Sequence, residues 1–251
     1  MGLRHIFLAF ISVTAVFASS PDNATAPPKN WGVALFDSFD SIDVFGPLNP
    51  LWYLAFSLQL NLALIAPSLS PVRVEPVDRA LNKHNSSFWF SVNPAHTYVN
   101  PPKDIEVLLI PGGPGSIMGD VNEVTEFVKK TYPNLKYLIT TCTGAGIAAR
   151  AGVLDGKRAT TNKKAWKTVT AMGPEVKWVS PARWTVDGNI WTSSGVTSGL
   201  DLIFAFIDEV YGAKHGKDLQ GTIEFNRVRD ACDDPFAEEH QVPPSGDCSQ
   251  S

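Results

Sequence analysis

Residues 137–152 read YLITTCTGAGIAARAG, and this stretch decides the fold. Its first half is an apolar, β-branched run that is typical of a buried strand, and its second half is a helix rich in alanine and punctuated by glycine. Cys142 stands at the corner between them. Most buried cysteines serve only packing. Whether Cys142 takes part in a reaction therefore depends on which other residues are expected to lie near it.

Apolar runs and helical patterns alternate on both sides of this stretch. WGVALF (31–36), NLALIAP (61–67) and IEVLLIPGG (105–113) predict buried strands. Helical spacing is expected within 44–60 after its prolines, and at 121–131, 143–156, 163–173 and 196–212. A short hairpin is expected between residues 71 and 98, and another at the Asp-Gly turn of 184–194. This alternation predicts an α/β fold, a parallel sheet with helices on both faces.

Composition limits the number of domains and the class of partner. The chain has 251 residues, of which 44% are hydrophobic and 18% charged, and this favours one globular domain. The formal net charge is −4 and there is no cluster of lysine and arginine. Nothing in the chain therefore predicts binding to nucleic acid or to an anionic membrane surface.

The first residues are typical of a secretory signal peptide. Arg4 precedes an apolar run from Ile6 to Ala18, and small residues follow before Pro21. The run is shorter than the roughly 20 residues that a membrane-spanning helix needs. We therefore expect a signal peptide at 1–20, a proline-rich linker at 21–30, and a secreted protein with no membrane anchor after cleavage.

Two further features fit an oxidising compartment. Asn23 and Asn85 each begin an Asn-x-Ser/Thr sequon, which makes them glycosylation candidates. Cys232 and Cys248 lie near the C-terminus, the latter within a polar tail at 237–251, and we expect them to form a disulfide. That pairing leaves Cys142 as the odd thiol.

The position of Cys142 favours reactivity. A side chain at a strand-to-helix corner faces helix N–H groups, which lower the pKa of a thiol, and a sharp turn exposes it as in the nucleophile elbow of hydrolases. By position alone, a small buried hydrophobe is an equally good interpretation.

Two other strand ends carry polar or glycine-rich turns that should lie near Cys142, because ligands bind at the carboxyl ends of parallel strands. Gly112 and Gly113 follow a buried strand, and their N–H groups can point at a developing negative charge. Asp43 follows the first strand, and a carboxyl next to a thiol is expected to have a raised pKa and to relay a proton. Asp37 and Asp40 in the same turn fit better as caps or solvated carboxylates, and by the residues alone this interpretation is equally open for Asp43.

The histidines predict neither a Cys-His pair nor a metal site. None follows a buried strand near Cys142, and no two have metal-ligand spacing. We therefore expect no metal and no cofactor. The histidines outside the signal peptide are His84, His96, His215 and His240.

Together, four motifs resemble the DJ-1/PfpI (ThiJ) superfamily, which has the class I glutamine amidotransferase-like fold. They are GVALFDSFDSIDVFGP (32–47), LLIPGGPGS (108–116), TTCTGAGIAARAGVLDGKRATTN (140–162) and WTSSGVTSGLDLIFAFI (191–207). They look like the branch that contains isonitrile hydratases, and they place the domain at 31–236. The resemblance implies a flavodoxin-like three-layer α/β/α sandwich and a homodimer.

The resemblance also implies a site and a reaction. In isonitrile hydratases the functional set is a cysteine, the threonine after it and an aspartate after the first strand, which correspond to Cys142, Thr143 and Asp43. Asn162 stands where other branches carry a histidine, which puts peptidase chemistry in doubt. The expected activity is cofactor-independent hydration of a small isonitrile to a formamide. Glyoxalase- or deglycase-like action on reactive carbonyls and a non-catalytic binding or redox-sensing role are the alternatives.

Overall fold

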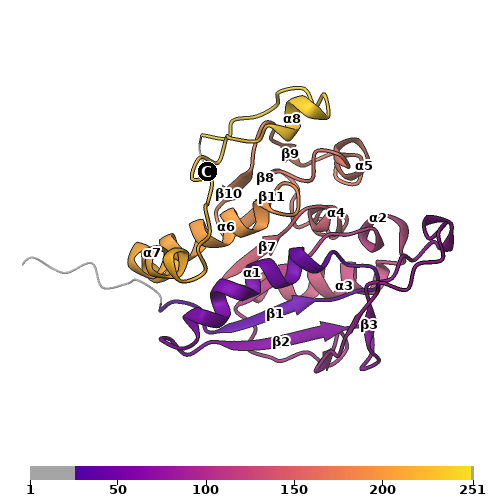
Figure 1. The fold of residues 1–251 in the computed structure, drawn as a ribbon, viewed down its shortest axis with the longest axis horizontal. Coiled ribbons are helices and arrows are strands. Elements are labelled where there is room, and N and C mark those ends of the chain that lie inside the picture. The colour runs from indigo at the N-terminus through magenta and orange to yellow at the C-terminus, as the bar shows by residue number, and fades with distance from the viewer. Residues whose placement is uncertain (1–25, 250–251) are drawn as a thin grey trace, which may run out of the picture.

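The structure is a computed structural model that describes residues 26–249 (Figure 1). The expected signal peptide, the first half of the linker and the sequon at Asn23 lie outside the described residues. Within them, no helix combines the length and the apolar character needed to cross a membrane.

A seven-stranded sheet forms the centre of the domain, in the order β10-β11-β7-β6-β1-β2-β5. All neighbouring strands are parallel except β10 and β11, which form the antiparallel hairpin that the Asp-Gly turn predicts. β6 and most of β7 are buried on both faces, because helices cover each side. The strands are β1 (Asn30–Ala34), β2 (Asn61–Ala66), β5 (His96–Thr97), β6 (Val107–Ile110), β7 (Tyr137–Thr140), β10 (Trp184–Asp187) and β11 (Ile190–Ser193).

Helices pack in two groups, one on each face of this sheet, which gives the expected flavodoxin-like three-layer fold. One group is α1 (Ser41–Leu54), α6 (Ser198–Ile207) and α7 (Ala213–Thr222), with a π-helical turn at Asp208–Gly212 between the last two. The other is α2 (Gly115–Met118), α3 (Asn122–Thr131), α4 (Gly144–Arg150) and α5 (Trp166–Thr170). Figure 1 shows α1 and α6 side by side on one face of the strands. Two short 3₁₀ helices lie at Arg79–Leu81 and Tyr132–Asn134.

Helix α1 begins earlier than its prolines predicted. It contains Pro47 and Pro50, although proline removes a backbone donor inside a helix. The Asp40 side chain caps the first turn by accepting a hydrogen bond from the N–H of Ile42 at 2.9 Å. Buried contacts of α1 with the sheet offset the lost backbone hydrogen bonds. The early start places Asp43 in the first turn of the helix rather than in a loop.

Two other helices are shorter than the sequence pattern predicts. The pattern at 143–156 yields α4 and then turns, because Gly152 has a positive φ of 75° that ends the helix. The pattern at 163–173 yields only the five-residue α5.

Small sheets lie outside the central one. β3 (Val72–Arg73) and β4 (Ser91–Val92) form the short hairpin predicted between residues 71 and 98. β8 (Arg158–Ala159) and β9 (Lys177–Trp178) form a parallel pair, and β8 contacts β10 and β11.

The C-terminal segment folds against the domain instead of leaving it as a separate polar tail. Cys232 and Cys248 form the expected disulfide. Helix α8 (Phe236–Glu239) lies between the two cysteines, and Ser245 exchanges two backbone hydrogen bonds with Ser180 at 2.6 and 2.8 Å. These contacts extend the folded unit past the predicted boundary at residue 236.

Candidate active site

Cys142 lies in a strained turn directly after β7. Its φ is +54°, a left-handed conformation that only glycine adopts without strain. This is the geometry of a nucleophile elbow, and it turns the thiol away from the line of the strand. The side chain is nonetheless buried, with 5% of the residue exposed.

The turn after β6 holds two other side chains in place. The N–H of Gly112 donates to Oδ2 of Asp43 at 2.9 Å, and the N–H of Gly113 donates to Oγ1 of Thr143 at 2.9 Å. The sequence predicted that these N–H groups would stabilise charge on a reacting group. The structure instead uses both to orient Asp43 and Thr143, because the three strand ends meet here.

Gly112 permits this close approach. A Cβ atom at this position would lie 2.5 Å from the backbone nitrogen of Thr143 and 2.9 Å from Oδ2 of Asp43. Any side chain would therefore push α1 and the elbow apart.

Asp43 is a buried acid with one free oxygen. The residue has no exposed surface, and Oδ1 accepts no hydrogen bond from any described residue. Burial raises the pKa of Asp43 well above its ordinary value of 3.8, and the charge of Asp40 adds to this. The Gly112 N–H and the Cys142 thiol act in the opposite direction but weigh less. Asp43 thus retains its proton well above the pH at which an exposed aspartate loses it.

The thiol of Cys142 also retains its proton, which corrects the expectation of a lowered pKa. Burial and then the charge of Asp43 raise the pKa of Cys142 well above its ordinary value of 9.0. The N–H of Thr143 and the amide of Asn162 lower this pKa by smaller amounts. Burial and the neighbouring acid together raise the pKa of the thiol by more than the hydrogen-bond donors near it lower this pKa.

Asn162 is a site residue that the sequence marked only by the absence of a histidine. Its Nδ2 donates to Sγ of Cys142 at 3.3 Å, and its Oδ1 accepts from the N–H of Ala165 at 3.0 Å. The second bond fixes which end of the amide faces the sulfur. The neighbouring Thr161 hydroxyl donates to the carbonyl of Cys142 at 2.8 Å.

Ser116 is a further site residue, and sequence reasoning missed it. Its hydroxyl donates to the carbonyl of Gly113 and lies 2.7 Å from Oγ1 of Thr143. The only signal was its place at the end of the motif LLIPGGPGS.

The remaining acids of the first turn are structural, as predicted. Asp40 caps α1, and Oδ1 of Asp37 accepts the N–H of Arg73 at 2.9 Å. Among residues 26–249, no group of histidine, cysteine and carboxylate side chains is arranged to hold a metal ion.

A buried cysteine at an elbow, paired with a buried acid on a flavodoxin-like sandwich, defines a class of thiol sites. Residues 33–209 match the DJ-1/PfpI family model. The chain belongs to the DJ-1/PfpI family.

Relatives of this chain include an enzyme and a regulator. The isonitrile hydratase of Pseudomonas putida is 27% identical over 198 residues, which cover 77% of each chain. The HTH-type transcriptional regulator GbdR of Pseudomonas aeruginosa is 29% identical over 136 residues, 51% of this chain but 35% of the regulator. A crystal structure of a ThiJ/PfpI family protein from Pseudomonas syringae shares the fold, with a TM-score of 0.67 and 23% identity over 88% of this chain and 83% of that one.

Replacing Gly112 by alanine tests the close approach. Gly112→Ala should slow alkylation of Cys142 by iodoacetamide, or change its pH dependence, because the new methyl group displaces Asp43 and Thr143. Gly221→Ala is the matched control, since a Cβ there meets no atom within 4 Å. Equal behaviour of both variants would contradict the packing described for Gly112.

The raised pKa of Asp43 predicts a pH dependence of stability. The folded state holds the proton more tightly than the unfolded state, so its contribution to stability is lost as pH rises from about 4 through the folded pKa. Urea unfolding of the wild type and Asp43→Asn should show that the asparagine variant gains relative stability with pH over this range. A difference that does not vary with pH would refute the raised pKa, and Asp78→Asn, at an exposed residue, serves as control.

Proposed function

We propose that this protein hydrates small isonitriles to N-substituted formamides, with Cys142 as nucleophile and Asp43 as acid. The observation that carries the proposal is the buried thiol beside a buried carboxyl whose pKa is raised and whose Oδ1 accepts no hydrogen bond from the described residues. The relationship to the isonitrile hydratase of Pseudomonas putida supports it.

This pairing suits the chemistry of an isonitrile. The terminal carbon of R–N≡C carries a lone pair, so it accepts a proton and then a nucleophile at the same atom. An acid and a thiol must therefore reach one carbon together. A carboxylate beside a free thiolate would lack the proton that this step needs.

The first step adds the thiol across the terminal carbon. Asp43 gives its proton to the carbon, the sulfur of Cys142 bonds to it, and the thiol proton passes to the Asp43 carboxylate. The product is the thioimidate R–N=CH–S–Cys142, in which the hydrogen of the thiol has moved to carbon overall. Asn162, which donates to Sγ, stabilises the negative charge on sulfur while this proton leaves.

Water completes the reaction. Positioned by Asp43 and Thr143, it adds to the thioimidate carbon as the nitrogen takes a proton, giving R–NH–CH(OH)–S–Cys142. The C–S bond then breaks, the hydroxyl proton returns to sulfur, and R–NH–CHO leaves. The balance is one isonitrile plus one water giving one formamide, with the thiol and the carboxyl regenerated.

The alternatives fit the site less well. Oxidation of cysteine follows its thiolate character, so a thiol with a raised pKa is a poor redox sensor. Asn162 supplies a hydrogen-bond donor where carbonyl chemistry would need a histidine base. A binding role without turnover draws support from the regulator GbdR, a relative over part of this chain.

Formamide production from cyclohexyl isocyanide tests the proposal. We expect turnover by the wild type, loss of turnover in Cys142→Ala, and a loss of about 10²-fold or more in Asp43→Asn, which retains the shape of the side chain but not its acidity. Asp78→Asn should match the wild type. If folded protein with a reduced thiol turns over no isonitrile, the proposal is wrong, and carbonyl chemistry or ligand binding is favoured.

We propose that the protein acts outside the cell. The disulfide between Cys232 and Cys248 supports this, because such bonds persist in oxidising compartments. Asn85 is exposed and therefore open to a glycan.

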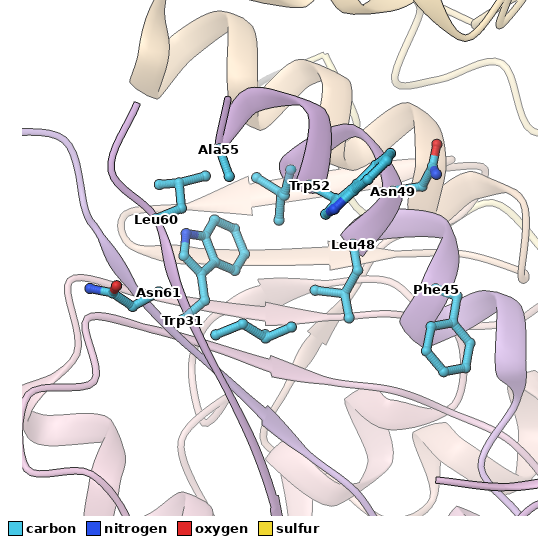
Figure 2. A pocket seen from close by; sticks show the side chains of 10 residues that line it. Trp31, Phe45, Leu48, Asn49, Trp52, Ala55, Leu60 and Asn61 are labelled. Carbon is cyan, nitrogen blue, oxygen red and sulfur yellow. The ribbon is translucent and has the colours of Figure 1, made fainter. Parts of the chain in front are cut away.

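We propose further that two copies associate through α1 and β2. Residues 44–72 contain no charged residue, yet Trp52, Phe56 and Leu62 of this stretch are more than half exposed. A cavity of about 460 Å³ lies between the helix and the strands, with Leu48 and Ala55 on one side and Trp31 and Leu60 on the other (Figure 2). In a two-fold dimer the same surface meets itself, so an uncharged face finds an uncharged partner.

Charge introduced on this face should separate the copies. Light scattering after gel filtration should show a dimer for the wild type and a monomer for Trp52→Glu combined with Phe56→Glu. Val99→Glu, which changes an even more exposed residue outside this stretch, should remain dimeric. A monomeric wild type would contradict the proposal.

A further inference from the structure

Lys163 forms a buried ionic hub directly beside Asn162. Its side chain and that of Asp234 have no exposed surface, and the two form an ion pair of 2.9 Å. The ammonium nitrogen also lies within hydrogen-bond distance of four oxygens, which belong to the segments after β8, before β10 and after β11. These are Oγ1 of Thr160 at 3.0 Å, the carbonyl of Thr161 at 3.2 Å, the carbonyl of Ala182 at 2.9 Å and Oγ of Ser194 at 3.0 Å.

The hub lies in the segment that contacts the thiol. Thr161 donates to the carbonyl of Cys142, and Asn162 donates to its sulfur. Lys163 contacts the carbonyl of Thr161 and the hydroxyl of Ser194 in the loop after β11, so it fixes the backbone that carries Asn162. The charges that act on the thiol directly are those of Asp43 and Asp40. Lys163 therefore acts on Cys142 through position rather than through its own charge.

Asp234 belongs to a segment that is far from this loop in sequence. We name residues 228–249 the C-terminal strap. Its two ends are joined to the domain by the N–H of Val228, which donates to Asp201, and by the bridge between Ser180 and Ser245. The disulfide from Cys232 to Cys248 closes the strap two residues before Asp234.

The strap provides the charge that the buried ammonium needs. Burial lowers the pKa of Lys163, and Asp234 is the charged group that opposes this. Without the carboxylate, the lysine is left with uncharged oxygens in a buried place, and it either loses its proton or moves toward water. Either change releases hydrogen bonds to Thr160, Thr161 and Ser194.

We propose that Lys163 is a positioning residue for the thiol site, and that the disulfide-closed strap controls the reactivity of Cys142 through the ion pair of Asp234 and Lys163. Loss of the ion pair frees the backbone at Thr161 and Asn162, so the amide no longer faces the sulfur. A dithiol that reduces the disulfide has the same effect: it is oxidised to its own disulfide, the S–S bond breaks, and two cysteine thiols form. This inference concerns the thiol of the proposed function, but it stands without isonitrile turnover.

Alkylation of Cys142 by iodoacetamide tests the proposal without any substrate. The rate is followed by mass spectrometry from about pH 6 to pH 10, where its increase with pH reports the thiolate fraction of Cys142. Asn162→Ala gives the reference shift of the alkylation profile, because it removes the hydrogen bond to sulfur. Asp234→Asn breaks the ion pair but retains the acceptor that Oδ1 offers to the N–H of Phe236.

Asp234→Asn is expected to slow alkylation at neutral pH about fivefold and to move its pH profile upward, as far as Asn162→Ala does. Cys232→Ser combined with Cys248→Ser should shift the profile in the same direction, and it leaves Cys142 as the single cysteine. Asp208→Asn breaks a different ion pair, with Arg227 at 2.7 Å, and should leave the profile unchanged.

A purely structural role would give another result. If Asp234→Asn and the double serine variant lower the unfolding temperature but leave the alkylation profile at its wild-type position, the proposal is wrong. If Asp208→Asn shifts the profile as much as Asp234→Asn, the effect is general loosening and the proposal is equally wrong. The alkylation results do not depend on isonitrile turnover, so the absence of turnover would change neither of them.

Discussion

The close approach of three strand ends at Gly112 is the contact on which the site depends. The N–H of Gly112 donates to Asp43, and the absence of a side chain lets the elbow residue Thr143 lie against it. Gly113 then binds the Thr143 hydroxyl. Helix α1, the turn after β6 and the elbow after β7 are thereby locked together, so Asp43 and Cys142 come to share one buried space.

That shared space determines the protonation of the site. Burial raises the pKa of both acidic side chains, the charge of Asp43 raises that of Cys142 further, and these effects outweigh the hydrogen-bond donors around them. The site resembles other pairs of neighbouring acidic groups, which do not readily ionise together because their negative charges repel each other. It differs from thiols activated as free thiolates, and this difference is what favours a reaction that needs a proton and a nucleophile at one atom.

A buried ion pair lies next to the loop that contacts the thiol. Lys163 joins the loop that bears Asn162 to the loop after β11, and Asp234 of the C-terminal strap balances its charge. A buried ion pair contributes little to stability by itself. Its value here is that it connects three segments that are distant in sequence.

Much of the fold could be predicted from the sequence, because apolar runs and glycine turns report local structure directly. The strands at 31–36, 61–67 and 105–113, the elbow at Cys142 and the disulfide all follow from local pattern or spacing. Helix α1 could not be placed correctly, since its prolines argue against a helix and only packing on the sheet overrides them.

The sequence pattern alone placed Cys142, Gly112 and Gly113 directly after buried strands, and the family resemblance added Asp43 and Thr143. Tertiary structure decided what they do there. The pKa of a thiol depends on desolvation and on charges that long-range folding brings near it, so a helix start that predicts a lowered pKa coexists with a raised one. The same reason hid Asn162, Ser116 and Lys163, whose roles arise only when distant strand ends and the C-terminal strap meet around the elbow.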